Sequence, residues 1–417
     1  MYRFLQGRLV FVRLTLLGAA AALIAVGILT IYAVGNPAQD SPASRAERYS
    51  EFWKKQLVFA GLGALAFIAV NLVNYRRLGE ISYWIFAAVL FLLLVLLLGK
   101  IIDLPFVPVI NGTHRWIIFT IAGRQLPAIQ PSELCKLAYV LALTWYLRFR
   151  SNYRSFSALV GPFLITLVPM VLILLEPDLG TVMLIMPVLL VMVFVAGARI
   201  KHLLLIALLA VLVSPVFWVV MRPYQRMRVA SLFLQSTAAQ QYAQDHPAFS
   251  KLVLGTKFNK RAWAAGYGFH LTRSKYAIAS GGRTGQGFRQ GPFVKYNQFL
   301  PESHNDFIFA IIAHQWGFYG ALGVIALFVV IFLCGIEIAH HNTDPFARLL
   351  ALGITAMFAV EVLVNISMTL GLMPITGLTL PFVSYGGSSL LTSMLSIGLL
   401  NNIGRARPFS VAPKLFE

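Results

Sequence analysis

The chain has 417 residues, of which 58% are hydrophobic and 12% charged, and it carries a formal net charge of +19. Soluble proteins average roughly 45–50% apolar and about 25% charged residues. This composition therefore excludes a soluble globular, disordered or collagen-like chain and indicates a membrane protein with several spans. The two cysteines, Cys135 and Cys334, lie in apolar runs and are expected to be buried and unpaired.

Apolar windows long enough to cross a bilayer, about 20 residues each, recur along the chain. The first, from Leu14 to Val34, is too long for the apolar part of a cleavable signal peptide. The windows run over about 12–34, 55–73, 81–99, 132–148, 157–175, 179–198, 202–221, 307–338, 347–372 and 384–404. We predict an all-α polytopic membrane protein with ten transmembrane helices, in a single domain covering residues 1–417.

Lys and Arg in the loops predict the orientation. With the N-terminus in the cytoplasm, the cytoplasmic loops hold about twice as many basic residues as the short external loops, the usual bias of membrane proteins. Both termini are therefore expected in the cytoplasm. One extracytoplasmic loop, about 222–305, is far longer, so function or disorder is expected there. Its polar middle, 235–260, resembles a surface excursion, and the glycines near 280–287 predict sharp turns.

Charges inside the predicted spans cost about 2.5–3.5 kcal/mol each on insertion scales, so each one raises a functional hypothesis. Glu133 and Lys136 lie three residues apart on one helical face and are expected to pair. The pair is either structural or the charged lining of a cavity. Glu361 lies four residues before Asn365, on the same face, and is expected to be a polar packing contact.

Two acidic residues stand where loops enter the membrane. Asp178, after Glu176 and Pro177, suits the start of the next helix, either as a cap or as a catalytic group. At the end of the long loop, Asn305 is expected to cap the next helix, which leaves Asp306 in its first turn. Partial burial would raise the pKa of Asp306 and make it a better general base.

Six segments, in order along nearly the whole chain, resemble the SEDS family (shape, elongation, division and sporulation), whose types are RodA and FtsW. They are NGTHRWI at 111–117, QPSELCKL at 130–137, PDLGT at 177–181, ASGG at 279–282, LPESHNDFIFA at 300–310, and PITG with LPFVSYGGSS within 374–389. The resemblance implies a peptidoglycan glycosyltransferase of the bacterial cytoplasmic membrane. Such an enzyme polymerises lipid II, an undecaprenyl-pyrophosphate-linked disaccharide peptide, into glycan strands for cell division or elongation.

The resemblance also implies roles for individual residues. Asp306 is the implied catalytic residue, as the general base on the acceptor sugar or as the ligand of a divalent cation such as Mg²⁺ or Mn²⁺. Glu133 and Lys136 would line the cavity. Further predicted substrate-binding residues in the matching segments are Gln130, Asp178, Arg115, Trp116 and Ser384. The implied partners are a class B penicillin-binding protein and other divisome or elongasome proteins, and no nucleic acid.

The long loop holds twelve Lys and Arg against two acidic residues, Asp245 and Glu302. This excess is either a solvated surface beside anionic headgroups or a funnel for a pyrophosphate-linked substrate. The candidates for such a funnel are Arg226, Arg228, Arg283 and Lys295.

The chain departs from the family pattern at several positions. The family usually has a basic residue at Ala128, Gln at Glu176 and at Glu361, Thr at Asn305, and acidic residues at His314 and Gln315. None of these changes falls on Asp306, Glu133 or Lys136, so we expect a divergent but active member.

Two other functions are kept as alternatives. A lipid II flippase would also use polar residues within a helical bundle, although the charges here gather near the outer face. The other alternative is a non-catalytic scaffold for a penicillin-binding protein. Between the two types, the stretches 196–199, 223–226 and 377–381 are closer to FtsW than to RodA.

Overall fold

The computed structural model describes residues 9–36, 50–102, 104–110, 113–121, 124–125, 127–148, 156–221, 223–296 and 300–405. The first two residues of the 111–117 segment and the basic residues near both chain ends, such as Arg3, Arg8 and Lys414, lie outside this part.

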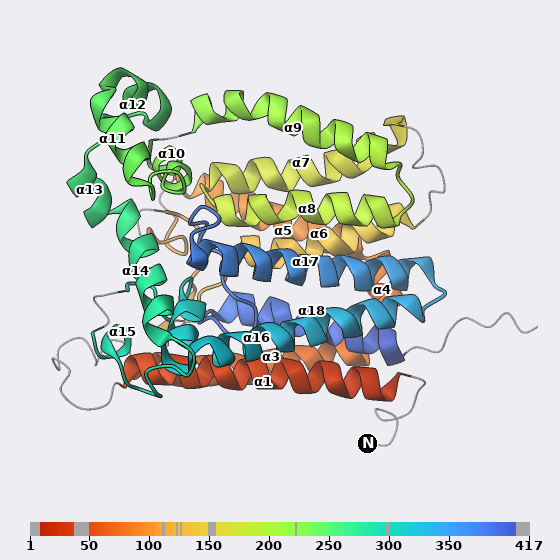
Figure 1. Ribbon diagram of the computed structural model, residues 1–417. Coiled ribbons are helices and arrows are strands. Elements are labelled where there is room, and N and C mark those ends of the chain that lie inside the picture. The colour runs from red at the N-terminus through yellow and green to blue at the C-terminus, as the bar shows by residue number, and fades with distance from the viewer. Residues whose placement is uncertain are drawn as a thin grey trace, which may run out of the picture.

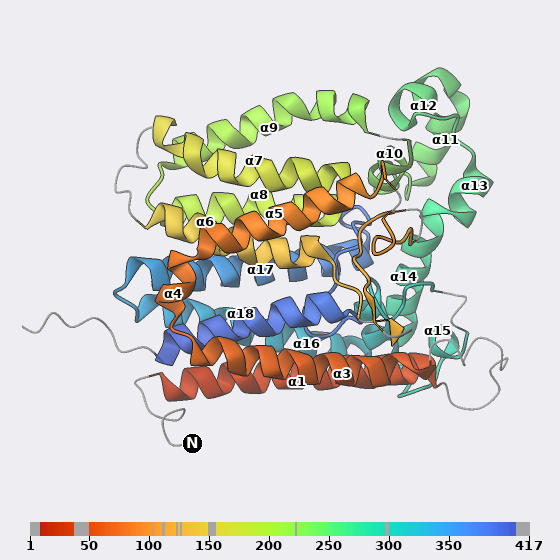
Figure 2. The same cartoon turned by 180° about the vertical axis from the view of Figure 1, so that it is seen from behind.

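In the described part of the chain, each predicted apolar window contains one long helix, and together these helices form a bundle (Figures 1 and 2). The helices are α1 (Val10–Gly35), α3 (Phe52–Leu72), α5 (Ser82–Leu98), α6 (Pro131–Leu147), α7 (Val160–Leu175), α8 (Leu179–Val195), α9 (Ile200–Val220), α16 (Ile308–His340), α17 (Pro345–Leu370) and α18 (Gly387–Arg405). By length and composition, α1, α3, α16 and α17 can each cross a membrane. The chain is therefore a multi-pass membrane protein, and the number of ten spans stays a prediction.

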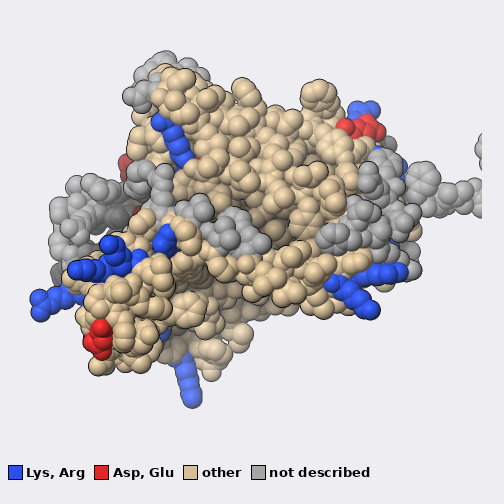
Figure 3. All heavy atoms as spheres, turned by 90° about the horizontal axis from the view of Figure 1, so that it is seen from above, with Lys and Arg blue, Asp and Glu red and all other residues tan. Residues whose placement is uncertain are grey.

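Burial differs strongly among these helices. α17 is buried along most of its length and packs on α16 and α8, whereas α3 is mostly exposed and packs on α18 and α1. α6 is also central, with residues on every face buried. The outer faces of α5, α7 and α9 expose large apolar side chains, and in the view of Figure 3 the charged side chains gather at the two ends of the bundle. A surface with an apolar band between charged ends suits a protein surrounded by lipid.

The connections between the helices lie at the two ends of the bundle (Figure 1). We call one of them the site end, because it contains 113–121, 176–178, 300–307 and 371–386. The other, the opposite end, contains α4 (Tyr75–Glu80) and η2 (Phe156–Leu159). A hairpin that the sequence did not predict, formed by β1 (Thr120–Ile121) and β2 (Arg124–Gln125), lies in the connection between α5 and α6.

The long loop is helical rather than disordered over the residues that the structure describes. Its helices are α10 (Pro223–Ala230), α11 (Thr237–Asp245), α12 (Pro247–Leu254), α13 (Lys260–Ala265), α14 (Tyr267–Gly281) and α15 (Pro292–Lys295). Leu234, Leu254, Phe258 and Trp263 form a small core of their own beneath α10 to α13. α14 packs on α16 and α17, and so brings this layer against the bundle at the site end (Figure 1).

The predicted span 307–338 is not one continuous helix, because α16 is broken at Gly317, where φ is 66°. The glycine-rich turn after α14 pairs with the break: Gln286 N donates to His314 O at 2.9 Å, and Phe318 N donates to Gly282 O at 2.9 Å. A Cβ atom on Gly285 would lie 2.1 Å from Gln315 O, so only glycine allows this approach. The predicted sharp turns near 280–287 are confirmed, and they are hydrogen-bonded to the helix break.

Candidate functional site

Asp306 lies in a turn that precedes α16, and not in the first turn of that helix. α16 begins at Ile308 with Phe307 as its N-cap, so the prediction that Asn305 caps the helix is wrong. The chain folds back instead, because Asn305 N and Phe307 N both donate to Glu302 O, at 3.1 and 3.3 Å. This turn leaves the Asp306 side chain partly buried at the site end.

The Asp306 carboxylate makes no hydrogen bond or ion pair with any residue that the structure describes. Burial raises the pKa of Asp306 to about 7, and the charge of Glu302 adds to this effect, whereas Arg228 opposes it. Asp178 and Arg115 act more weakly, in opposite directions. A carboxylate whose pKa lies near neutral suits general-base chemistry at neutral pH.

The backbone of Asp306 is held from α17. Asn365 Nδ2 donates to Asp306 O at 3.0 Å and to Leu378 O at 2.6 Å, so one buried amide joins the Asp306 turn to the connection after α17. A Cβ atom on Gly377, which has a φ of 78°, would lie 3.5 Å from Asp306 Oδ2. A side chain at this position would be in ordinary contact with the carboxylate, so glycine is favoured here by its positive φ.

Asp178 begins α8 as predicted and extends a polar chain to the start of α6. Its carboxylate accepts from Thr181 N at 3.4 Å, from the Thr181 hydroxyl at 3.0 Å and from the Ser132 hydroxyl at 3.0 Å. Gln130 Nε2 in turn donates to Ser132 Oγ at 3.1 Å. The cap interpretation of Asp178 is confirmed, and Ser132 is the link to Gln130 that the sequence analysis missed.

Arg115 clamps the turn between α7 and α8. Its Nε donates to Glu176 O at 3.0 Å, and its terminal nitrogen donates to Pro177 O. Both partners are uncharged carbonyls, so neither of them offsets the positive charge of the Arg115 guanidinium near Asp306. The Glu176 side chain is buried in the same turn, and its Oε1 has no hydrogen-bond partner among the described residues.

Replacing Glu176 with Gln is expected to stabilise the protein increasingly as the pH rises. Burial and the neighbouring Asp178 raise the pKa of Glu176 to about 8, whereas the unfolded chain ionises near 4.5. Wild-type stability therefore falls between these pH values, because the folded state must keep a proton that the unfolded state releases. Gln has no such proton, so we expect a gain on the order of 4 kcal/mol near pH 8. Thermal unfolding at about pH 5 and pH 8 measures it, and an equal gain at both would contradict the explanation.

Lys136 is the centre of a buried ion cluster that joins α6 to α17. Its Nζ lies 2.8 Å from Glu133 Oε2 and 2.5 Å from Glu361 Oε1, and all three side chains are almost fully buried. The predicted pair of Glu133 and Lys136 is confirmed. Glu361 is a buried polar contact between helices, as predicted, and its partner Lys136, which the sequence did not indicate, makes it the second carboxylate of the cluster. Asn365, which holds Asp306, lies one helical turn beyond Glu361 on α17.

The remaining predicted residues are placed differently. Ser384 is buried, and its hydroxyl donates to Asn305 O at 2.8 Å, so it supports the Asp306 turn. Arg226 donates to the carbonyls of Met221 and Val219 at the end of α9, which uses its side chain locally. Trp116 is partly buried next to Arg115, Arg283 is exposed after α14, and Lys295 ends α15. Among the four residues of the predicted funnel, Arg228 is the one whose charge lowers the pKa of Asp306.

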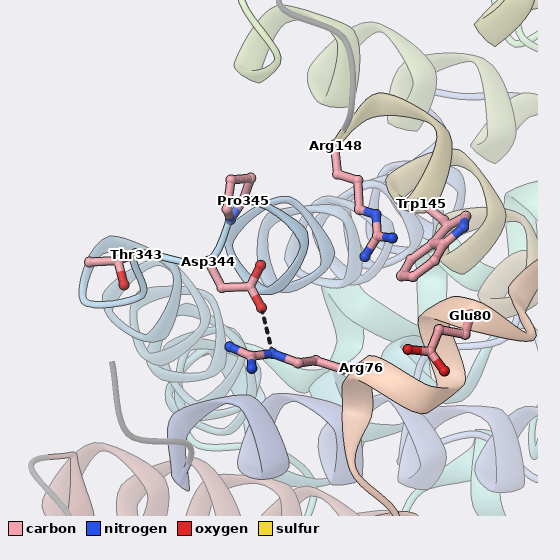
Figure 4. A pocket seen from close by; sticks show the side chains of 7 residues that line it. All are labelled: Arg76, Glu80, Trp145, Arg148, Thr343, Asp344 and Pro345. Carbon is pink, nitrogen blue, oxygen red and sulfur yellow. Dashed lines mark hydrogen bonds and ion pairs between the residues drawn. The ribbon is translucent and has the colours of Figure 1, made fainter. Parts of the chain in front are cut away.

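A separate cavity of about 350 Å³ lies at the opposite end of the bundle (Figure 4). Arg76, Trp145, Arg148 and Asp344 point into it, and Arg76 Nε lies 3.1 Å from Asp344 Oδ2. Its place, far along the bundle from the Asp306 turn, excludes it from the candidate site. Among the described residues, no group of three or more His, Cys, Asp or Glu side chains is arranged to hold a metal ion.

The chain is similar to known proteins both in sequence and in fold. The family model FTSW_RODA_SPOVE, described as a cell cycle protein, matches residues 13–408. The chain is 32% identical to the peptidoglycan glycosyltransferase RodA of Treponema pallidum, over 92% of this chain and 95% of that protein. It is 34% identical to stage V sporulation protein E of Bacillus subtilis, over 85% and 87%.

Two solved structures are similar over 94% of this chain. One is a chain from a study of how a peptidoglycan synthase complex coordinates polymerization and crosslinking, with a TM-score of 0.70, 29% identity and 96% of that chain covered. The other is the rod shape determining protein RodA of Thermus thermophilus, with a TM-score of 0.61, 27% identity and 95% covered.

Proposed function

The chain belongs to the FtsW, RodA and SpoVE family, and we propose that it polymerises lipid II into glycan strands with Asp306 as its catalytic residue. Like the relatives so named, it is a peptidoglycan glycosyltransferase. The observation that carries the proposal is the Asp306 carboxylate, which is partly buried, has no described bonding partner, and lies within the electrostatic reach of Arg228 and Arg115.

These groups match the chemistry of glycosyl transfer. The 4-hydroxyl oxygen of the acceptor sugar forms a bond to the anomeric carbon of the donor, while the bond from that carbon to the lipid pyrophosphate breaks. Asp306 accepts the hydroxyl proton as general base. The leaving pyrophosphate gains negative charge, and the positive charges of Arg228 and Arg115 at the same end of the bundle stabilise it.

A divalent cation is compatible with this site if the substrate supplies part of its ligands. Mg²⁺ commonly keeps several waters and binds through one or two carboxylates together with substrate phosphates. The described residues offer no cage made of protein alone, so Asp306 and the substrate pyrophosphate would hold the ion. When bound, it would neutralise charge on the pyrophosphate.

We place the site end at the outer face of the bacterial cytoplasmic membrane, with ten spans in one domain. In support, α1 begins and α18 ends at the opposite end of the bundle, as expected when both termini are cytoplasmic (Figure 1). A class B penicillin-binding protein is the proposed partner, supported by the similarity to a chain of a peptidoglycan synthase complex. Relatives named RodA and FtsW match at 32% and 31% identity, so the division type rests on the three stretches alone.

The purified protein, reconstituted with its partner in vesicles and given lipid II, is expected to form glycan strands detectable by gel separation. An arm with EDTA, followed by added Mg²⁺ or Mn²⁺, tests the cation: reversible loss shows that the reaction needs a divalent cation, and unchanged synthesis shows that Asp306 acts without one. Translocation of lipid II across the vesicle membrane without polymer would favour the flippase. Polymer formed only by the partner would favour the scaffold.

A further inference from the structure

Gln56 is a fully buried amide on a helix that is otherwise mostly exposed. The buried residues of α3 are Gln56, Gly63 and Asn71. Gln56 shares a face with Phe52 and Phe59, which lie four residues before and three residues after it, so all three point the same way at the site end. A buried amide is costly unless its donor and its acceptor are both bonded, so its partners indicate why it is there.

Both ends of the Gln56 amide bond to the backbone just before α18. Nε2 donates to Ser384 O at 3.1 Å, and Oε1 accepts from Gly386 N at 3.3 Å. A side chain that both donates and accepts is needed for these two contacts, and among residues of this length an amide provides it. Phe52 adds a ring contact, stacked on Tyr385 at 4.7 Å between centroids and an interplanar angle of 17°.

The backbone that Gln56 holds is the one that supports the Asp306 turn. Ser384 Oγ donates to Asn305 O at 2.8 Å, and Tyr385 N donates to His304 O at 2.9 Å. His304 also contacts the Phe52 ring, at 4.9 Å between centroids. The residues immediately before Asp306 are therefore bonded to a segment that α3 fixes in place.

We propose that Gln56 is a positioning residue for Asp306. It acts through residues 384–386, whose hydrogen bonds hold the backbone of His304 and Asn305, and so sets where the Asp306 carboxylate stands relative to the two sugars. Gln56 itself is fully buried, so it exposes no surface that a substrate could contact. This inference rests on the proposed function, because it assigns a position to the general base. A displacement of about 1 Å in a reacting group can cost on the order of 100-fold in rate.

The test compares Gln56→Met with Asn71→Leu in the full chain, reconstituted with its partner. Met matches the length of Gln without its hydrogen bonds. Asn71 is an equally buried amide of α3 at the opposite end, bonded to Asn401 of α18 at 2.6 Å. We expect kcat for lipid II polymerisation to fall at least tenfold in Gln56→Met, with KM within twofold of wild type. Asn71→Leu should keep kcat, even if it lowers thermal stability equally.

A double-variant measurement separates this path from a general loss of packing. Ser384→Ala removes the next hydrogen bond in the same chain, so Gln56→Met combined with Ser384→Ala should be no slower than the worse single variant. If the effects multiply, or if folded Gln56→Met keeps kcat within twofold, the proposal is overturned. Should Gln56→Met not reach the membrane, Ser384→Ala alone carries the test, and an unchanged kcat overturns it. Absence of polymer from the wild type would contradict the proposed function instead.

Discussion

Asp306→Asn is expected to abolish glycan polymerisation, with a loss of about 10²–10⁴-fold, while the protein stays folded. Asn has nearly the volume of Asp, and the Asp306 carboxylate has no hydrogen bond or ion pair among the described residues that the change would break. Removing a partly buried charge without a partner should leave thermal stability equal or slightly raised. The measurements are strand synthesis from lipid II and thermal unfolding of the same preparation. An active variant would mean that another group is the base.

The pH dependence of the wild type tests the same assignment. Because burial raises the pKa of Asp306 to about 7, the carboxylate is protonated below that pH and cannot accept a proton. The rate should fall about tenfold per pH unit below pH 7 and level off above it. Glu302→Gln is the matched control, since the Glu302 charge contributes to the raised pKa. Its removal should move the acidic limb to lower pH without changing the plateau, and an unmoved limb would contradict this origin.

The long helices were predictable because their signal is local. An apolar run such as Leu14 to Val34 must be shielded from water, and a helix satisfies its own backbone within lipid. The break in α16 was not predictable in the same way. Gly317 lies in a run that is otherwise favourable for a helix, and the break depends on the turn at Gly285, about 30 residues earlier in the chain, pairing with that run. Such pairing is a tertiary event that periodicity does not encode.

In the candidate site, too, residues with a local signal were predicted, and contacts between distant segments were not. Asp306, Glu133 and Lys136 were found because a charge in or near an apolar run costs energy and so needs a reason. The pairing of Glu361 with Lys136 was missed, because it joins α6 to α17 across the bundle. Gln56 was missed for another reason: it is uncharged. Asn365 was noted only for sharing a helical face with Glu361, and its hydrogen bond to the Asp306 backbone was missed. A buried amide also needs bonded partners, so polar uncharged residues inside apolar windows were an available signal.

Lys136→Met is expected to destabilise the protein by about 3–5 kcal/mol, the usual cost of breaking a buried ion pair by removing one partner. Without Lys136, the carboxylates of Glu133 and Glu361, which now lie 2.8 and 2.5 Å from its Nζ, would share a buried site with no cation. The loss should appear in thermal unfolding of the purified protein. Its comparison is Lys295→Met, because Lys295 belongs to the half-buried end of α15, outside the bundle. Equal unfolding of Lys136→Met and wild type would contradict the cluster as an ion pair.

Removing all three charges of the cluster distinguishes a structural role from a role in substrate binding. The triple variant Glu133→Gln, Lys136→Met and Glu361→Gln leaves no unpaired charge, so stability should return close to that of the wild type. Both carboxylates already form ion pairs with Lys136, so we expect the cluster to act by connecting α6 to α17. Asn365, which holds the Asp306 backbone, lies one turn further along α17. A stable triple variant should then recover most of the polymerisation lost in Lys136→Met. If it is stable but inactive, the charges themselves contact the substrate, and the cavity-lining interpretation of Glu133 and Lys136 is the correct one.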